Sequence, residues 1–291
     1  MAVAAGSALH LQLTDQNDFV MNFKVETLLT VAASALLVGT LITGCQDTGY
    51  PDPQPVTTPP NTSSKVLFVN ATADANSLMP YLENTAVGNA LGLGQATNYV
   101  NVPYLGSLQF RVKGAGGTLG TNDLSIKSTI LTGSNYTAFV TDSTTRPFVT
   151  NAANLTTDVG GVRLLVVNDP LSQTLTAGSG GVRFFHFVPD AGLPASSTAT
   201  TPLALSIKLT GPGSATSTTT ILNRAYRNVA TTAFSPVAAG AYKVDVYTGS
   251  TATGTAITSS TLTVEAAKLY TLYANGSTRR KTAVVNRIQH N

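Results

Sequence analysis

The 291-residue chain has no tryptophan, one cysteine and few charged side chains. A single cysteine excludes a disulfide framework and a cysteine-rich metal site. Charged residues make up 11% of the chain, well below the roughly 25% of a typical globular protein, which excludes a coiled coil and a highly charged disordered chain. The chain is rich instead in threonine (45 residues) and glycine (25). Threonine fits pleated sheets and glycine fits turns, so the composition predicts an all-β protein.

Long apolar runs are also scarce, and the clearest one spans only 15 uncharged residues, from Leu28 to Ile42. A membrane-spanning helix needs about 20 apolar residues, so this run fits the core of a signal peptide better. It is followed by Ile42-Thr43-Gly44-Cys45, which resembles the lipobox of bacterial lipoproteins, where cleavage precedes a cysteine that carries diacylglycerol. The sequence therefore predicts lipid attachment at Cys45. The alternative for this thiol is a buried, small apolar side chain.

The segments on either side of this run complete the picture of an exported lipoprotein. Asp15 and Asp18 do not suit a signal peptide, whereas Met21 starts a short segment with Lys24 ahead of the apolar run. We therefore interpret residues 1–44 as an upstream extension plus a lipoprotein signal peptide, with translation starting at Met21. Residues 45–64 carry the predicted lipid and a proline-rich tether. The predicted location is the bacterial cell envelope, at the outer membrane.

From residue 65 onward, short apolar runs alternate with polar residues and are broken by turn formers. Period-two alternation is clear over residues 108–113, 203–209 and 242–246. Such alternation indicates strands with one face on a core and one face in water. Helical periodicity is nearly absent, and strands recur about every 10 residues between turn signals. This spacing is typical of an antiparallel sandwich or barrel.

An internal repeat organises these strands. Residues 66–75 align with 182–191, which places Phe68 on Phe184 and Asp74 on Asp190. The later matches pair residues 106–112 with 240–246, 135–139 with 269–273, and 165–168 with 283–286. We therefore predict two tandem antiparallel, Ig-like β-sandwich domains over residues 65–170 and 181–291, joined by a linker at 171–180.

These repeats carry a family resemblance. Residues 181–191, GVRFFHFVPDA, resemble the opening VRxxHxxPDA signature of the domain-of-unknown-function family 4397, which is common in bacterial envelope proteins. Residues 239–246 and 267–276 are similar to that family's AGxYxVxV and GxxYTxxAxG strands. In the first repeat the signature is weaker, because Asn70 replaces the histidine and Ala73 the proline. The resemblance implies a β-sandwich-like fold and a surface location, and it implies no activity.

Two motifs invite a catalytic or nucleotide-binding interpretation. Residues 114–120 are glycine-rich, but the third glycine of a dinucleotide-binding loop is misplaced and no helix follows, which favours a hairpin turn. His186 and Asp190 have the spacing of a base and its orienting carboxylate, but no G-x-S-x-G elbow supplies a nucleophile. We expect His186 to pack at a strand end and Asp190 to shape the turn.

Acidic and basic side chains gather in two parts of the chain that could bind a metal ion or a polyanion. Asp158, Asn168 and Asp169 are the nearest approach to a calcium cluster, although turn-forming residues explain their spacing equally well, and we predict no metal and no cofactor. Residues 65–170 hold six basic and six acidic side chains, whereas residues 181–291 hold ten basic and three acidic ones. The triplet Arg279-Arg280-Lys281 is a candidate patch for a polyanion such as an acidic polysaccharide or lipid headgroups. A solvated basic face is the alternative, and no nucleic-acid motif is present.

Together these features predict a lipid-anchored envelope protein that is not an enzyme. Its expected role is binding, adhesion or structural support, with a glycan or an envelope protein as partner. A hydrolase of envelope polysaccharide is the first alternative, with Asp190 or Asp245 as acid and base, because glycosidases need two carboxylates about 5–10 Å apart. A spacer or scaffold in a surface assembly is the second alternative.

Overall fold

The computed structural model describes residues 63–102, 106–114, 124–145, 161–194, 201–211 and 218–290. All of them belong to one compact unit, Pro60–Asn291. The predicted signal peptide, Cys45, most of the tether and Asp158 lie outside the described residues. In the described part of the chain, no helix is long and apolar enough to cross a membrane.

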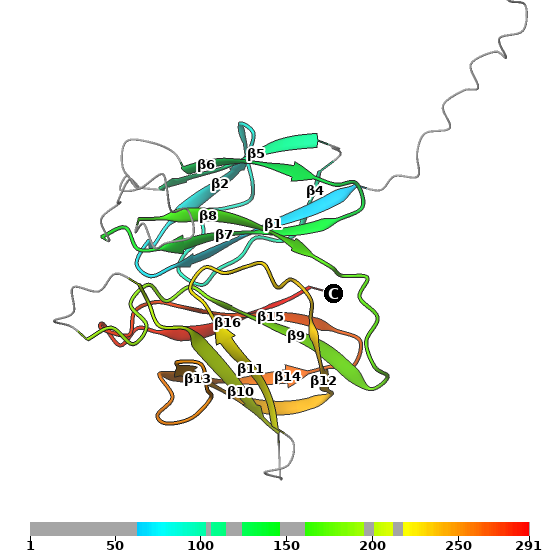
Figure 1. Ribbon diagram of the computed structural model, residues 1–291. Helices are drawn as coiled ribbons and strands as arrows, with labels where there is room; N and C mark the ends of the chain where they lie inside the picture. The colour runs from blue at the N-terminus through cyan, green and yellow to red at the C-terminus, as the bar shows by residue number, and fades with distance from the viewer. Residues whose placement is uncertain are drawn as a thin grey trace, which may run out of the picture. The chain divides into compact units, whose positions relative to one another are not determined.

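The described residues form sixteen strands and no helix (Figure 1). The first half contributes β1 (Ser64–Thr72), β2 (Leu78–Leu82), β3 (Thr85–Ala86), β4 (Val100–Val102), β5 (Gly106–Gly114), β6 (Leu124–Ile130), β7 (Asn135–Asp142) and β8 (Arg163–Asp169). The second half contributes β9 (Ser179–His186), β10 (Leu205–Thr210), β11 (Thr218–Arg224), β12 (Ser235–Ala238), β13 (Gly240–Thr248), β14 (Thr258–Val264), β15 (Leu269–Asn275) and β16 (Val284–Gln289).

The strands build four four-stranded sheets, and each half of the chain supplies two of them. The first half forms sheets with the orders β4-β1-β7-β8 and β3-β2-β5-β6, and the second half forms β12-β9-β15-β16 and β11-β10-β13-β14. The two halves thus have the same topology. Each pair of sheets encloses an apolar core, so the predicted all-β fold of two sandwiches is confirmed. The residue boundaries of the two repeats stay a prediction.

One part of the fold prediction is wrong, because the sandwiches are not purely antiparallel. β1 pairs with β7 in parallel, and β9 pairs with β15 in parallel. Between β1 and β7 the chain crosses to the other sheet and back twice, through β2–β3 and then through β5–β6, so β1 and β7 can run in the same direction. A parallel pair therefore lies at the centre of one sheet in each sandwich.

The predicted register of the last strand is also wrong. The repeat alignment places Asn168 on Asn286, because a Val-Val-Asn sequence occurs in both copies. In the sheets, Asn168 lies opposite Tyr136 on β7, and the residue opposite the equivalent Tyr270 on β15 is Gln289. Packing of the strand's inner face, rather than the short recurring sequence, sets this register.

A third apolar cluster joins the two sandwiches through their parallel-paired sheets. Phe139 lies at its centre, with ring centroids 5.7 Å from Phe185, 5.0 Å from Phe187 and 5.7 Å from Tyr273. Its buried members come from both halves of the chain: Leu67, Val69, Ala71, Phe139 and Val167 from the first, and Phe185, Phe187, Tyr273 and Ile288 from the second. The central strands are consequently buried on both faces, and the two sandwiches share one interior.

Candidate functional site

The signature histidine is a structural residue in a fully buried position. His186 Nδ1 accepts a hydrogen bond from the Val188 N–H at 3.1 Å, and Nε2 lies 3.0 Å from the Leu203 carbonyl. The ring is therefore neutral with its proton on Nε2, and burial lowers its pKa to about 3, which outweighs the opposite effect of the Leu203 carbonyl. This placement agrees with the expected strand-end packing and leaves no free nitrogen for base catalysis.

Asn70 reproduces the histidine's hydrogen bonds in the first repeat. Its Oδ1 accepts the Thr72 N–H at 3.2 Å, which is the counterpart of the Val188 N–H bond. Its Nδ2 donates to the carbonyls of Leu91 and Ala75. An amide thus replaces the imidazole because both offer an acceptor and a donor nitrogen in this position, and the amide makes one additional donor bond. The weaker signature of the first repeat keeps the same structural function.

The aspartates of the two signatures perform one task in both repeats. Asp74 accepts hydrogen bonds from Ser143 Oγ at 2.5 Å and from the Thr144 N–H at 2.7 Å. Asp190 accepts the equivalent bonds from Ser277 Oγ at 2.5 Å and the Thr278 N–H at 2.8 Å. Each carboxylate therefore fixes the turn that follows the parallel-paired strand. Burial alone would raise the pKa of Asp74, but these hydrogen bonds hold it below its ordinary value.

The predicted basic triplet lies in the turn that Asp190 fixes. Arg279 donates its backbone N–H to Asp190 and its Nε to the Leu193 carbonyl at 3.3 Å. Arg280 turns toward the first repeat, where Nη1 is 3.4 Å from Asp74 Oδ2 and Nη2 donates to Thr145 Oγ1 at 3.0 Å. Lys281 is exposed. The three residues are adjacent in space, but the Asp74 carboxylate forms an ion pair with Arg280 and partly neutralises its positive charge.

A polar cluster that the sequence did not reveal lies between the two sandwiches. Arg183 on β9 forms a fully buried ion pair with Asp169 on β8. Its Nε also donates to Thr271 Oγ1 at 2.7 Å, and Nη1 donates to the Asn168 and Thr232 carbonyls, each at 3.1 Å. The guanidinium lies 4.6 Å from the Phe234 ring centroid. Every part of this charged group therefore has a protein partner.

The remaining oxygen of Asp169 connects to the chain's last histidine. Asp169 Oδ2 accepts hydrogen bonds from Tyr99 Oη at 2.9 Å and Thr137 Oγ1 at 2.7 Å. Tyr99 Oη is in turn 2.6 Å from His290 Nδ1. Burial lowers the pKa of His290 to about 4, with the charge of Asp169 acting in the opposite direction, and burial together with the Asp169 charge raises the pKa of Tyr99. Both groups are neutral at physiological pH.

This cluster bears on the calcium hypothesis. Both carboxylate oxygens of Asp169 are occupied by Arg183, Tyr99 and Thr137. The backbone carbonyl of a neighbouring candidate, Asn168, accepts a hydrogen bond from Arg183 Nη1. In the described part of the chain, no group of three histidine, cysteine or acidic residues is placed to hold a metal ion. The arrangement therefore links the two sandwiches through buried polar contacts.

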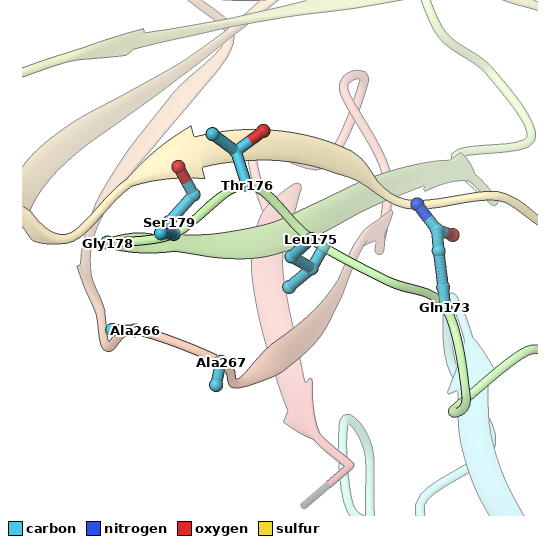
Figure 2. A pocket seen from close by; sticks show the side chains of 8 residues that line it. Gln173, Leu175, Thr176, Gly178, Ser179, Ala266 and Ala267 are labelled. Atoms are coloured by element: carbon cyan, nitrogen blue, oxygen red, sulfur yellow. The ribbon is translucent and has the colours of Figure 1, made fainter.

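Two small hollows are lined by residues that the structure describes. The larger of the two, about 200 Å³, is lined by the segment before β9 and by the turn between β14 and β15, and Figure 2 shows its uncharged lining residues. Gln173 lines it, but its amide is bonded to the backbone of Phe234. The second, about 130 Å³, lies between Gly94 of the first repeat and Asn275 of the second. No titratable side chain lines either hollow, and ligand pockets are typically about 300 Å³ or larger.

Comparison with known proteins agrees with the resemblance in the sequence. A family model described as a domain of unknown function, DUF4397, matches residues 64–193. The match covers 130 of the 291 residues of the chain. The DUF4397 match covers the first sandwich and the opening strand of the second, β9. The sequence of the second repeat nevertheless agrees with the VRxxHxxPDA signature at more positions than that of the first. No curated protein matches the chain.

A solved structure is also similar in part. It is a protein from Bacteroides eggerthii, provisionally described as a cell adhesion protein, with 11% sequence identity. The similarity covers 80% of this chain and 97% of that chain, with a TM-score of 0.21. A TM-score this low carries no weight for fold or function.

Proposed function

We propose that this protein is a noncatalytic component of the bacterial cell envelope, with a binding, adhesive or structural role. The observation that carries the proposal is the use of the signature's polar side chains. His186, Asn70, Asp74 and Asp190 are all committed to hydrogen bonds that hold turns and strand ends. The family's most recognisable residues thus build a rigid scaffold, and the outer faces of that scaffold are left to contact partners.

The carboxylates proposed for a hydrolase are poorly suited to acid–base work. Asp245 forms an ion pair with Lys243 at 2.9 Å and accepts a hydrogen bond from Ser259 Oγ at 2.5 Å. Burial raises its pKa, but these two partners outweigh burial and lower it below the ordinary value. A general acid at neutral pH needs the opposite shift. Asp190 is held by the turn after β15. The noncatalytic proposal is therefore favoured over a glycosidase.

The shared apolar interior supports the structural side of the proposal. The cluster around Phe139 and the Arg183–Asp169 pair join the two sandwiches without a flexible hinge. Such a body is suited to presenting a binding surface on a rigid scaffold. We further propose that the anchor is a lipid on Cys45, at the outer membrane, and that residues 45–64 are the tether.

Purified full-length protein can separate these roles. The experiment incubates it with isolated envelope polysaccharide and measures both co-sedimentation and release of reducing sugar ends. The proposal predicts binding or retention without any increase in reducing ends. Release that is abolished by Asp190→Asn or Asp245→Asn, with the fold intact by circular dichroism, would establish the hydrolase instead.

A further inference from the structure

Five side chains at the junction of the two sandwiches form a closed ring of hydrogen bonds. Arg183 Nε donates to Thr271 Oγ1 at 2.7 Å, and Thr271 Oγ1 lies 2.6 Å from His290 Nε2. His290 Nδ1 lies 2.6 Å from Tyr99 Oη, which donates to Asp169 Oδ2 at 2.9 Å. The ion pair between Asp169 and Arg183 closes the ring. Tyr99 and Asp169 come from the first half of the chain and the other three from the second, so the ring joins the two halves.

The two charged members of the ring fix the position of every proton in it. Asp169 is ionised because it pairs with Arg183, so its carboxylate can only accept hydrogen bonds. The single hydroxyl proton of Tyr99 is therefore donated to Asp169, and the bond between Tyr99 and His290 uses a proton on Nδ1. Arg183 can only donate to Thr271, whose own hydroxyl proton then goes to His290 Nε2. The ring thus requires a neutral His290 with its proton on Nδ1.

A second proton on His290 is incompatible with this ring. It would lie on Nε2 and point at Thr271 Oγ1, which already accepts from Arg183. The hydroxyl proton of the fully buried Thr271 would lose its acceptor, and two cations would share one oxygen. The titratable groups that face His290 are Tyr99 from the segment before β4, Asp169 from β8 and Arg183 from β9. Burial lowers the pKa of His290 to about 4; the charge of Asp169 opposes this shift, and that of Arg183 adds to it.

Separation of the two sandwiches would relieve this conflict. Tyr99, the partner of His290 Nδ1, belongs to the other half of the chain, so separation opens one side of the imidazole to water. Each sandwich has an apolar core of its own, which does not depend on the junction. A proton therefore binds the separated arrangement more strongly than the joined one, and it shifts the equilibrium toward separation. The other buried histidine, His186, bonds to Val188 and Leu203 of its own repeat and lacks this link to the junction.

We propose that this ring is an acid-sensitive switch: when His290 takes up a proton, the junction between the two sandwiches opens while both cores stay folded. At neutral pH the closed ring and the apolar cluster around Phe139 hold the pair as one body. In acid the two sandwiches become separate bodies on one chain, and the apolar faces that they shared are exposed. The switch goes beyond the proposed envelope role and does not depend on it.

The test measures how fast buried thiols react with 4,4′-dithiodipyridine as the pH is lowered from neutral. The full-length chain with Cys45→Ser receives one new thiol at a time: Val69→Cys in the junction, Val112→Cys in the first core or Val244→Cys in the second. Each rate is divided by that of free cysteine at the same pH. The junction thiol should react faster in acid, approaching about 300-fold, because the pKa of His290 is about 4 in the joined state and 6.5 ordinarily. The two core thiols should stay protected.

Two histidine variants separate the switch from general acid unfolding. His290→Gln cannot take up a proton, so the junction thiol should lose its acceleration in acid. The matched control His186→Asn removes the other buried imidazole and should leave the acceleration unchanged. Equal acceleration of all three thiols would overturn the proposal, because it would indicate unfolding of the whole unit. So would no acceleration at the junction, acceleration that survives in His290→Gln, or acceleration that disappears in His186→Asn.

Nitrogen-15 NMR of the unaltered chain tests the ring without any variant. The bonds described above place the proton of His290 on Nδ1 and that of His186 on Nε2, so the two buried histidines should show opposite tautomers at neutral pH. A proton on Nε2 of His290 at neutral pH would contradict the ring and with it the switch.

Discussion

Replacing Asp169 with asparagine is the sharpest test of the lock between the two sandwiches. Asp169→Asn keeps the shape of the side chain but removes its charge. Arg183 is left buried with no counter-ion, and Tyr99 and Thr137 lose a charged acceptor. The guanidinium cannot escape to water, because both side chains of the ion pair are almost wholly buried.

The expected loss is large on the scale of protein stability. Removing one partner of a buried ion pair costs about 3–5 kcal/mol. Whole proteins are stable by about 5–15 kcal/mol, so this single change removes a substantial share of the free energy of unfolding. For a folded unit of this size, the melting temperature should fall by on the order of 10 °C.

Differential scanning calorimetry and urea unfolding measure this loss directly. Because the two sandwiches share an interior, the wild type should unfold in one transition. Arg183→Met supplies the partner variant, since it removes the buried charge and keeps much of the apolar volume. The double variant should be clearly more stable than the sum of the two single losses predicts. A loss below about 1 kcal/mol for Asp169→Asn, or strict additivity, would refute the view that this pair locks the repeats.

Further predictions concern the buried histidines, the signature aspartates and metal dependence. Burial depresses the pKa of His186 to about 3 and of His290 to about 4, so the unfolded chain binds these protons first. The free energy of unfolding should therefore fall as the pH drops from about 6.5 to about 4, by up to about 1.4 kcal/mol per pH unit for each histidine; a flat profile by urea titration would contradict this. His186→Asn should be tolerated and should reduce the slope, because Asn70 makes the same bonds, whereas His186→Ala should cost about 1–3 kcal/mol. Asp74→Ala should cost about 1–2 kcal/mol by urea unfolding and speed proteolysis of its turn, and unchanged proteolysis would count against the turn-fixing role. Melting should be equal in EDTA and in excess calcium, since Asp169 is already occupied, and a calcium-dependent increase would show a site.

Much of the fold was predictable because the sequence patterns that indicate strands are local. Alternation along β5 and β13 identified half-buried strands, and both are strands in the structure. The parallel pairing was not predictable, since it joins β1 to a strand more than sixty residues away. Around Phe185, consecutive residues of β9 are apolar, so apolar side chains point to both faces of the strand. This is a local signal that β9 is buried on both faces.

The site was harder to predict than the fold. Arg183 would ordinarily be assigned to a solvated face, and only the tertiary structure brings Asp169 to it. The repeat alignment placed β16 in the wrong register against β8. It therefore did not show that His290 is the structural counterpart of Asp169, and nothing in the sequence connected these two residues of the cluster. By contrast, the turn role of Asp190 followed from its position beside Pro189, because both residue types favour turns.

Lipid attachment at Cys45 is the most direct test of the proposed envelope role. Cells expressing the wild type and Cys45→Ala are labelled with palmitate, fractionated, and compared for label in the protein and for its recovery with membranes. The proposal predicts labelled wild type in the outer-membrane fraction and unlabelled Cys45→Ala that is released from it. Absence of label from the wild type, or equal membrane recovery of both proteins, would contradict the anchored envelope protein described above.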